Sequence, residues 1–276
     1  MRNLLLCSMF LVTVYVSGYI EPANAVVPQA YLKVVYPLNY TIASFNKVIN
    51  SGRHHGNDLA ELYRERGQEY GRLHHYKEAI EDYTRCINLH PGLVTVYLDR
   101  AVAHARLEQY DAAFADFSRA LKRDPGNASA YNARGALNFL LGHYQDATND
   151  FKRYLKLRPD DSYRLLWLYM SEKNLQPDKS TDLANYTDGV SLDIWPGAMV
   201  RLFLGQVPVE SVVKALSDNM GKWTNGTRCE AYFYLGQYYL LRGERDNALQ
   251  FFRKAVATKA TGYMEYEFAV AYSLKL

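Results

Sequence analysis

Apolar residues recur at helical spacing along most of the chain, and between residues 60 and 159 they form three copies of one 34-residue pattern. Prolines at positions 91, 125 and 159 mark the period. An alanine, an aromatic residue and a small residue lie twelve, eight and twenty-four positions before each proline. In that order they are Ala79, Ala113 and Ala147, then Tyr83, Phe117 and Phe151, then Gly67, Ala101 and Gly135. The pattern predicts three successive pairs of helices.

The spacing within each copy predicts that the two helices of a pair run antiparallel and pack closely. A small residue in the first helix lets the second helix approach, and the proline ends the second helix and sets the next turn. A helix-turn-helix unit with a period of 34 residues matches the tetratricopeptide repeat. We therefore expect an all-α solenoid of antiparallel helix pairs, with three tetratricopeptide repeats over residues 60–159.

Beyond residue 159 the pattern weakens and then returns. Residues 160–228 are predicted to form degenerate helical repeats. Four residues then reproduce the small, alanine, aromatic and alanine positions: Gly236, Ala248, Phe252 and Ala255. Residues 229–276 are therefore predicted to form a fourth clear repeat and a capping helix that begins near Tyr263, because a terminal repeat needs its exposed face covered.

The first 25 residues have the organisation of a secretory signal peptide. Arg2 precedes an apolar run from Leu4 to Val16, and the segment ends in Ala23-Asn24-Ala25. We expect cleavage after Ala25, export to the periplasm and no stable membrane anchor after cleavage. An uncleaved anchor is the alternative, but about 13 apolar residues fall short of the ~20 that span a bilayer.

Residues 26–59 are predicted to form an irregular arm and one short helix. The apolar residues Ile42, Phe45, Val48 and Ile49 follow helical spacing within residues 40–50. Such a helix caps the first repeat or, as an alternative, makes the contact of a homodimer.

Composition and motifs point away from catalysis and from nucleic acid. The chain of 276 residues is 49% hydrophobic and 22% charged, with a net charge of +3 and no basic stripe. It has no HExxH, CxxC, GxSxG or phosphate-loop motif, so we expect no enzyme, no catalytic residue, no cofactor and no metal. Cys86 and Cys229 remain after cleavage, and they are expected to be buried free thiols rather than a disulfide.

An arginine and an aspartate recur together in the three repeats. Arg66, Arg100 and Arg134 precede the small residue, and Asp82, Asp116 and Asp150 follow each arginine by 16 positions. In the fourth copy both positions become apolar together, as Leu235 and Phe251. Joint presence and joint loss predict that the two side chains touch, within a repeat or across a junction. Their predicted role is structural, because a guanidinium can hold a carboxylate through two bonds.

The first helices of stacked pairs line a concave face that can hold a peptide or a partner helix. Counting inward positions in each repeat gives a mixed and largely uncharged set. The candidate partner-binding residues are Arg64, Gln68, Leu98, Val102, Asn132 and Phe139. The set lacks the Lys, Asn and Arg clamp by which some co-chaperone repeats bind a C-terminal carboxylate.

Three stretches in the second half of the chain resemble a known family: SYRLLWLYMSEKNL, RLFLGQVPVESVVKAL and AYFYLGQYYLLRGERDNALQFFRKAVA. They are similar to the NlpI-type bacterial envelope lipoproteins. The resemblance implies a periplasmic adaptor that dimerises, docks a tail-specific envelope protease and brings to it peptidoglycan (cell-wall) hydrolases. The chain departs from that family because Cys7 follows Leu6 early in the apolar run, which is not a lipobox.

Two functions from different classes follow. The first is a non-enzymatic periplasmic adaptor that binds proteins or peptides through its repeat surface. The second is a structural repeat subunit of an envelope export or polysaccharide-assembly complex.

Overall fold

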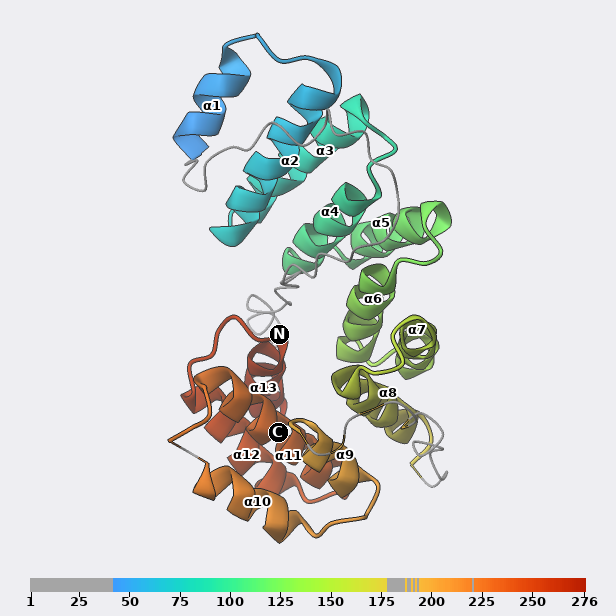
Figure 1. The fold of residues 1–276 in the computed structure, drawn as a ribbon, viewed down its shortest axis with the longest axis vertical. Coiled ribbons are helices and arrows are strands. Elements are labelled where there is room, and N and C mark those ends of the chain that lie inside the picture. The colour runs from blue at the N-terminus through green and yellow to red at the C-terminus, as the bar shows by residue number, and fades with distance from the viewer. Residues whose placement is uncertain (1–41, 178–186, 188–189, 191, 193, 220) are drawn as a thin grey trace, which may run out of the picture. The chain divides into compact units, whose positions relative to one another are not determined.

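The structure is a computed structural model that describes residues 42–177, 187, 190, 192, 194–219 and 221–276 (Figure 1). Within these residues the chain forms thirteen α-helices and no strand, which confirms the predicted all-α class. The predicted signal peptide and the irregular arm before residue 42 lie outside the described residues. None of the described helices is long and apolar enough to cross a bilayer.

The chain divides into two compact units, and the boundary between residues 116 and 117 falls inside one helix. The N-terminal unit, described from residue 42 to residue 116, contains four complete helices and the start of α5. They are α1 (Ile42–Asn50), α2 (Gly56–Arg72), α3 (Tyr76–Leu89), α4 (Val94–Arg106) and α5 (Tyr110–Arg123). Helix α2 packs on α3, α3 packs on α4, and α1 packs on α2.

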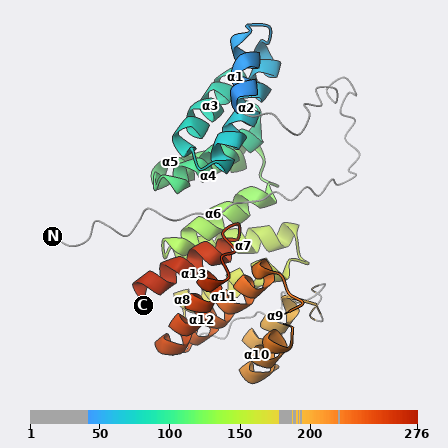
Figure 2. The same cartoon turned by 90° about the vertical axis from the view of Figure 1, so that its left-hand side faces the viewer.

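The C-terminal unit, residues 117–276, contains the remaining eight helices. They are α6 (Ala128–Leu140), α7 (Tyr144–Leu157), α8 (Ser162–Leu175), α9 (Gly197–Phe203), α10 (Val209–Asp218), α11 (Asn225–Leu241), α12 (Arg245–Ala257) and α13 (Met264–Lys275). Successive helices pack in antiparallel pairs, and α13 lies against both α11 and α12 (Figure 2).

The small residue of the first helix has the predicted mechanical role. A Cβ added to Gly67 would lie 2.7 Å from Cε1 of Tyr83, and one added to Gly236 would lie 2.5 Å from Cε1 of Phe252. Both distances are too short for ordinary van der Waals contact, so a larger residue would push the second helix away.

The fourth repeat begins earlier than the sequence indicated. The sequence placed its start at residue 229, but α11 begins at Asn225. The side chain of Thr224 accepts a 3.1 Å hydrogen bond from the backbone N–H of Thr227 and thereby caps the helix. Cys229 consequently lies inside α11.

Candidate partner-binding surfaces

The three arginine–aspartate pairs lie within repeats, between the first and the second helix. In each pair the guanidinium donates two hydrogen bonds to the two carboxylate oxygens. The Nε–Oδ2 and Nη2–Oδ1 distances are 2.6 and 2.7 Å for Arg66 with Asp82, 2.7 and 2.9 Å for Arg100 with Asp116, and 2.9 and 2.6 Å for Arg134 with Asp150. All three carboxylates are buried. The two-bond geometry joins each helix pair in one register.

The pKa values of these groups follow from the pairing and from burial. The hydrogen bond with Asp82 raises the pKa of Arg66, and the bond with Asp150 raises the pKa of Arg134. Burial raises the pKa of Asp150, and Arg134 opposes that effect. Arg66 and Arg134 are therefore held firmly in their charged form.

In the first two repeats the third guanidinium nitrogen, Nη1, also donates a hydrogen bond to the helix that precedes the repeat. Nη1 of Arg100 donates to Oγ1 of Thr84 on α3 at 3.0 Å. Nη1 of Arg66 donates to Oδ1 of Asn46 on α1 at 2.6 Å. Helix α1 therefore supplies the first repeat with the contact that the second helix of a preceding repeat supplies to the next one.

The fourth repeat replaces the charged pair with apolar packing. Leu235 and Phe251 occupy the arginine and aspartate positions, and both are buried. In the third repeat the guanidinium carbon of Arg134 lies 5.9 Å from the ring centroid of Tyr131. In the fourth repeat the tyrosine at the same position is Tyr232, and its ring centroid lies 6.3 Å from that of Phe251. The two positions that hold an arginine and an aspartate in the first three repeats thus also accept two apolar side chains that pack with an aromatic ring.

The N-terminal first-helix face, defined by Arg64, Gln68, Leu98 and Val102 on α2 and α4, carries polar side chains that face solvent. Arg64 is half-buried and makes two hydrogen bonds of 2.8 Å to Glu61. Gln68 is exposed and donates to Asp99 at 3.0 Å across the two helices. Val102 is half-buried, and Leu98 is 7% exposed. Leu98 was predicted to bind a partner, but it belongs to the buried core, so this face offers the polar Arg64 and Gln68 and the half-buried Val102.

The C-terminal first-helix face differs from the prediction. Phe139 is 1% exposed, and Asn132 is buried with its Oδ1 accepting a 2.8 Å bond from Nε of Arg164. Phe139 was predicted to line an open groove, but in this structure it is not open to a partner. The physical reason is that aromatic rings from three other helices enclose it: Tyr144 of α7 at 5.4 Å, Trp167 of α8 at 5.0 Å and Phe268 of α13 at 6.1 Å.

Phe268 of α13 meets one aromatic ring from each of three first helices. Its ring centroid lies 6.1 Å from Phe139 on α6, 4.9 Å from Trp167 on α8 and 6.1 Å from Phe233 on α11. We call these four residues the aromatic cluster. Trp167 is fully buried at its centre and also packs edge-on against Phe139 at 5.0 Å. Rings at these separations contribute attraction beyond their buried area.

A polar cluster accompanies the aromatic one. The hydroxyl of Tyr234 donates to Glu265 of α13 at 3.1 Å. Glu230 accepts bonds from the hydroxyl of Tyr163 at 3.1 Å and from Nε1 of Trp195 at 2.9 Å. Burial raises the pKa of Glu230 to about 7 and also raises the pKa of Glu265.

Sequence reasoning did not identify Glu230, Glu265 or Phe268 as residues of a site. All three lie at helix positions that read as ordinary charge or core, and they meet only because α13 returns to α6, α8 and α11. The available signal for this site was a pair of acidic residues, Glu265 and Glu267, in the first turn of the predicted capping helix. Acidic residues are common in the first turn of a helix, so this signal did not point to a site.

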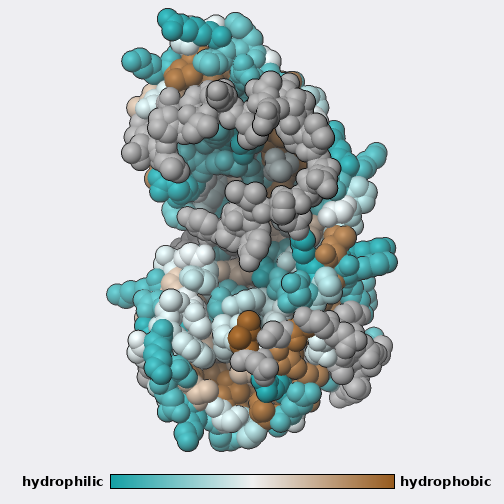
Figure 3. Space-filling view, in the orientation of Figure 1, coloured by the Kyte–Doolittle hydropathy of each residue, from teal (hydrophilic) through white to brown (hydrophobic). Residues whose placement is uncertain are grey.

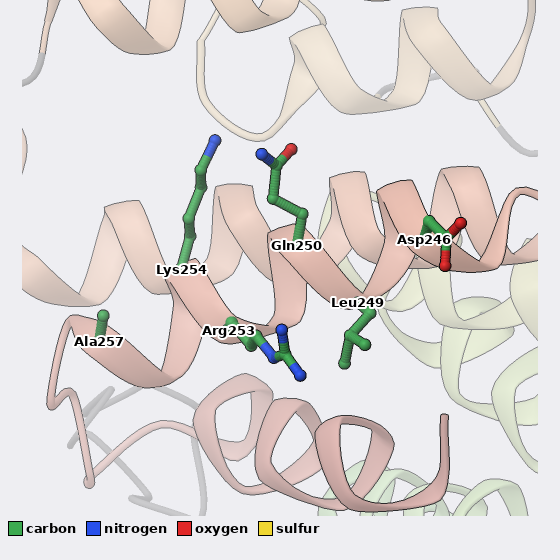
Figure 4. Close-up of a pocket in the computed structure, with 6 residues that line it drawn as sticks. All are labelled: Asp246, Leu249, Gln250, Arg253, Lys254 and Ala257. Carbon is green, nitrogen blue, oxygen red and sulfur yellow. The ribbon is translucent and has the colours of Figure 1, made fainter.

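Other features of the described residues show no chemistry of their own. They contain no group of His, Cys, Asp and Glu side chains that could hold a metal ion. Cys86 and Cys229 are buried and free, and burial raises their pKa values to about 11 and about 12. A hollow of about 470 Å³ runs along the outer side of α12 and is lined by Asp246, Leu249, Gln250, Arg253, Lys254 and Ala257 (Figure 4). Because all six come from one helix, the hollow is an open surface feature.

Comparison with known proteins identifies the repeats. A family model described as tetratricopeptide repeat matches residues 64–128 and 98–162, and a second model of that description matches residues 230–258. Over 120 residues the chain is 34% identical to the lipoprotein NlpI homolog of Haemophilus influenzae. That match covers 42% of this chain and spans only 38% of the relative.

A solved structure shows the same fold. A tetratricopeptide repeat protein from Parabacteroides merdae superposes over 84% of this chain and 90% of its own, with a TM-score of 0.54 and 20% identity. YrrB, described as a tetratricopeptide-repeat protein with an unusual peptide-binding site, aligns over 86% of this chain and all of its own, with a TM-score of 0.45 and 18% identity.

Proposed function

Since the chain is a tetratricopeptide-repeat protein that resembles an NlpI-type lipoprotein over part of its length, we propose that it is a non-enzymatic adaptor that binds proteins or peptides. The observation that carries the proposal is the N-terminal first-helix face, where Gln68 is exposed and Arg64 and Val102 are half-buried. Adaptable polar groups beside an accessible apolar side chain suit recognition of an extended or helical segment.

The finer proposal places this adaptor in the periplasm, with a tail-specific envelope protease and peptidoglycan hydrolases as partners. The signal-like residues 1–25 support export, and the relative is named a lipoprotein. A homodimer is part of the proposal as well, and α1 acts as a cap of the first repeat, because Asn46 on α1 accepts a hydrogen bond from Arg66. Light scattering of the purified chain measures the oligomeric state.

Affinity capture from the native periplasm tests the proposal. The bait carries residues 26–276 with a tag at its N-terminus, because α13 ends next to the C-terminus. A Val102→Glu bait places a charge on the N-terminal first-helix face, and an Ala115→Glu bait places the same charge at an exposed position of α5 as a control. We expect the first change to reduce partner recovery at least about ten-fold, and the control to leave it unchanged.

Mass spectrometry of the captured proteins separates the two functions. A tail-specific protease together with a cell-wall hydrolase supports the adaptor. Export or polysaccharide-assembly subunits without a protease would overturn the protease part of the proposal and favour a structural subunit. Equal recovery by the Val102→Glu and control baits would contradict the assignment of the binding face.

A further inference from the structure

The C-terminal helix α13 packs on the fourth repeat and brings one aromatic ring to the rings of three first helices. It runs along α11 and α12, and its Phe268 enters between rings supplied by α6, α8 and α11 (Figure 2). The first helices of this unit therefore present a complete aromatic recess, and the residue that fills it comes from the same chain.

The polar contacts of α13 are poorly matched to burial. Two buried carboxylates, Glu265 of α13 and Glu230 of α11, share the vicinity of one guanidinium, Arg164 of α8. Arg164 also bonds Asn132 and faces Asp161 at 4.0 Å, so its charge is divided. Tyr234 supplies one hydrogen bond to Glu265, and Tyr163 and Trp195 supply one each to Glu230. Burial nevertheless raises the pKa of both carboxylates, so burying Glu265 in its charged form weakens the docking of α13.

The connection between α12 and α13 is short. Residues 258–263 link the two helices, and Tyr263 packs against Gly226 at the start of α11. A short tether gives a docked segment an effective concentration in the millimolar range. A modest intrinsic affinity is therefore enough to keep α13 in place, and a partner helix that carries better-matched contacts can replace it.

We propose that α13 is a tethered occupant of the C-terminal first-helix face, and that a partner helix competes with it for Phe139, Trp167 and Phe233. The inference rests on the proposed protein-binding function. It adds a second binding surface, and α13 controls access to that surface. The partner chemistry is read from α13 itself: a helix with an acidic residue and an aromatic residue three positions apart, as in Glu265 and Phe268. Such a pair lies on one helix face.

A peptide with the sequence of residues 258–276, labelled with fluorescein, tests the competition by anisotropy. It is titrated into the wild-type chain, a Phe268→Ala chain and a Leu274→Ala chain. Leu274 is the matched control, because it lies on the same helix and is 56% exposed. We expect the peptide to bind the Phe268→Ala chain at least about ten-fold more tightly than the other two, because only that chain has lost its own aromatic anchor.

The peptide that carries alanine at position 268 should not bind any of the three chains. Equal affinity of the unaltered peptide for the Phe268→Ala and Leu274→Ala chains would overturn the proposal. So would equal binding of the two peptides to the Phe268→Ala chain, because the recess would then not be the binding site.

Hydrogen exchange on the unmodified chain tests the same idea without any substitution. A tethered occupant opens while the unit stays folded, so the amides of α13 should show protection factors at least about ten-fold smaller than those of α11. Equal protection in α11, α12 and α13 would show that α13 is an integral part of the core and would overturn the proposal. Neither the anisotropy titration nor the hydrogen exchange uses a cellular partner. A negative result in either one therefore overturns the proposal for α13 and leaves the adaptor proposal standing. A negative capture experiment overturns the adaptor proposal and leaves both measurements on α13 valid.

Discussion

Both units contain helix pairs joined by an arginine and an aspartate, but the C-terminal unit also contains a pair, the fourth repeat, that is joined by apolar packing. The described N-terminal unit holds two arginine–aspartate pairs, Arg66 with Asp82 and Arg100 with Asp116, and its first-helix face is polar. The C-terminal unit is organised around Trp167 and Phe268, and its fourth repeat has lost the charged pair. In the space-filling view the visible surface is mainly hydrophilic at the top, whereas hydrophobic patches gather in the lower half (Figure 3).

This difference separates what defines the repeat from what defines the site. Close packing of a small residue against an aromatic residue occurs in both units, as at Gly67 with Tyr83 and Gly236 with Phe252. The charged pair is exchangeable with apolar packing, since Leu235 and Phe251 replace it. The repeat needs the close contact between helices, and the chemistry beside that contact is free to change with function.

Removing the central ring of the C-terminal unit should have the largest effect. A Trp167→Ala chain loses contacts with four aromatic residues at a fully buried position, so we expect the free energy of unfolding to fall by about 4 to 5 kcal/mol. All three tryptophans lie in this unit, so urea unfolding followed by the fluorescence of Trp195 and Trp223 reports on it alone.

Ile194→Ala is the control for this experiment, because Ile194 is 66% exposed and its loss should change the unfolding free energy by less than about 0.5 kcal/mol. A fall of less than about 2 kcal/mol in the Trp167→Ala chain would show that the aromatic cluster does not stabilise the unit as described.

Breaking one charged pair in the N-terminal unit should have the next largest effect. Asp116→Ala leaves the guanidinium of Arg100 largely buried without its carboxylate, so we expect a loss of about 3 kcal/mol. Arg100→Ala combined with Asp116→Ala should cost less than either single change, because no unpaired charge remains. Hydrogen exchange of α4 and α5 measures the difference, since this unit has no tryptophan.

A variant that copies the fourth repeat tests whether the two chemistries are exchangeable. Arg100→Leu with Asp116→Phe reproduces Leu235 and Phe251, and we expect a stability within about 1 kcal/mol of the wild-type chain. The absence of energetic coupling between Arg100 and Asp116 in the double-mutant cycle would refute the structural role of the pair.

The dependence of stability on pH should distinguish the buried carboxylates of the C-terminal unit. Glu230 has a pKa of about 7 in the folded chain and an ordinary value of 4.5, so between these values the folded state holds a proton that the unfolded state releases. The unfolding free energy should therefore fall as pH rises from about 4.5 to 7, by at most about 3 kcal/mol. Glu265 acts in the same direction.

Glu230→Gln removes this contribution, so its stability should depend less on pH over that range. Glu210→Gln, at an exposed position of α10, is the matched control. Urea unfolding at pH 5 and pH 8 measures both slopes, and identical slopes for Glu230→Gln and the wild-type chain would mean that Glu230 is ionised in the folded state throughout.

The 34-residue period was sufficient to predict the helices, their close contacts and the charged pairs, because each depends on residues less than one repeat apart. The charged pairs had a further signal in the sequence, because the arginine and the aspartate are replaced together in the fourth repeat, by Leu235 and Phe251. The covering of Phe139 by Phe268 was not predictable, because inward positions were counted on each repeat alone and the two residues lie in elements far apart along the chain. The polar cluster at Glu230 and Glu265 was missed for the same reason.

The polar face of the N-terminal unit should show the smallest effect, which sharpens the contrast with Trp167. Gln68 is exposed and its bond to Asp99 spans α2 and α4, so Gln68→Ala should lower the unfolding free energy by about 0.5 to 1 kcal/mol. Burial raises the pKa of Asp99, and Gln68 opposes that effect, so the substitution should raise this pKa further. Carbon-detected NMR titration of Asp99 measures the change. A pKa that falls, or a stability loss as large as that of Asp116→Ala, would mean that this face is a structural core and not a surface available to partners.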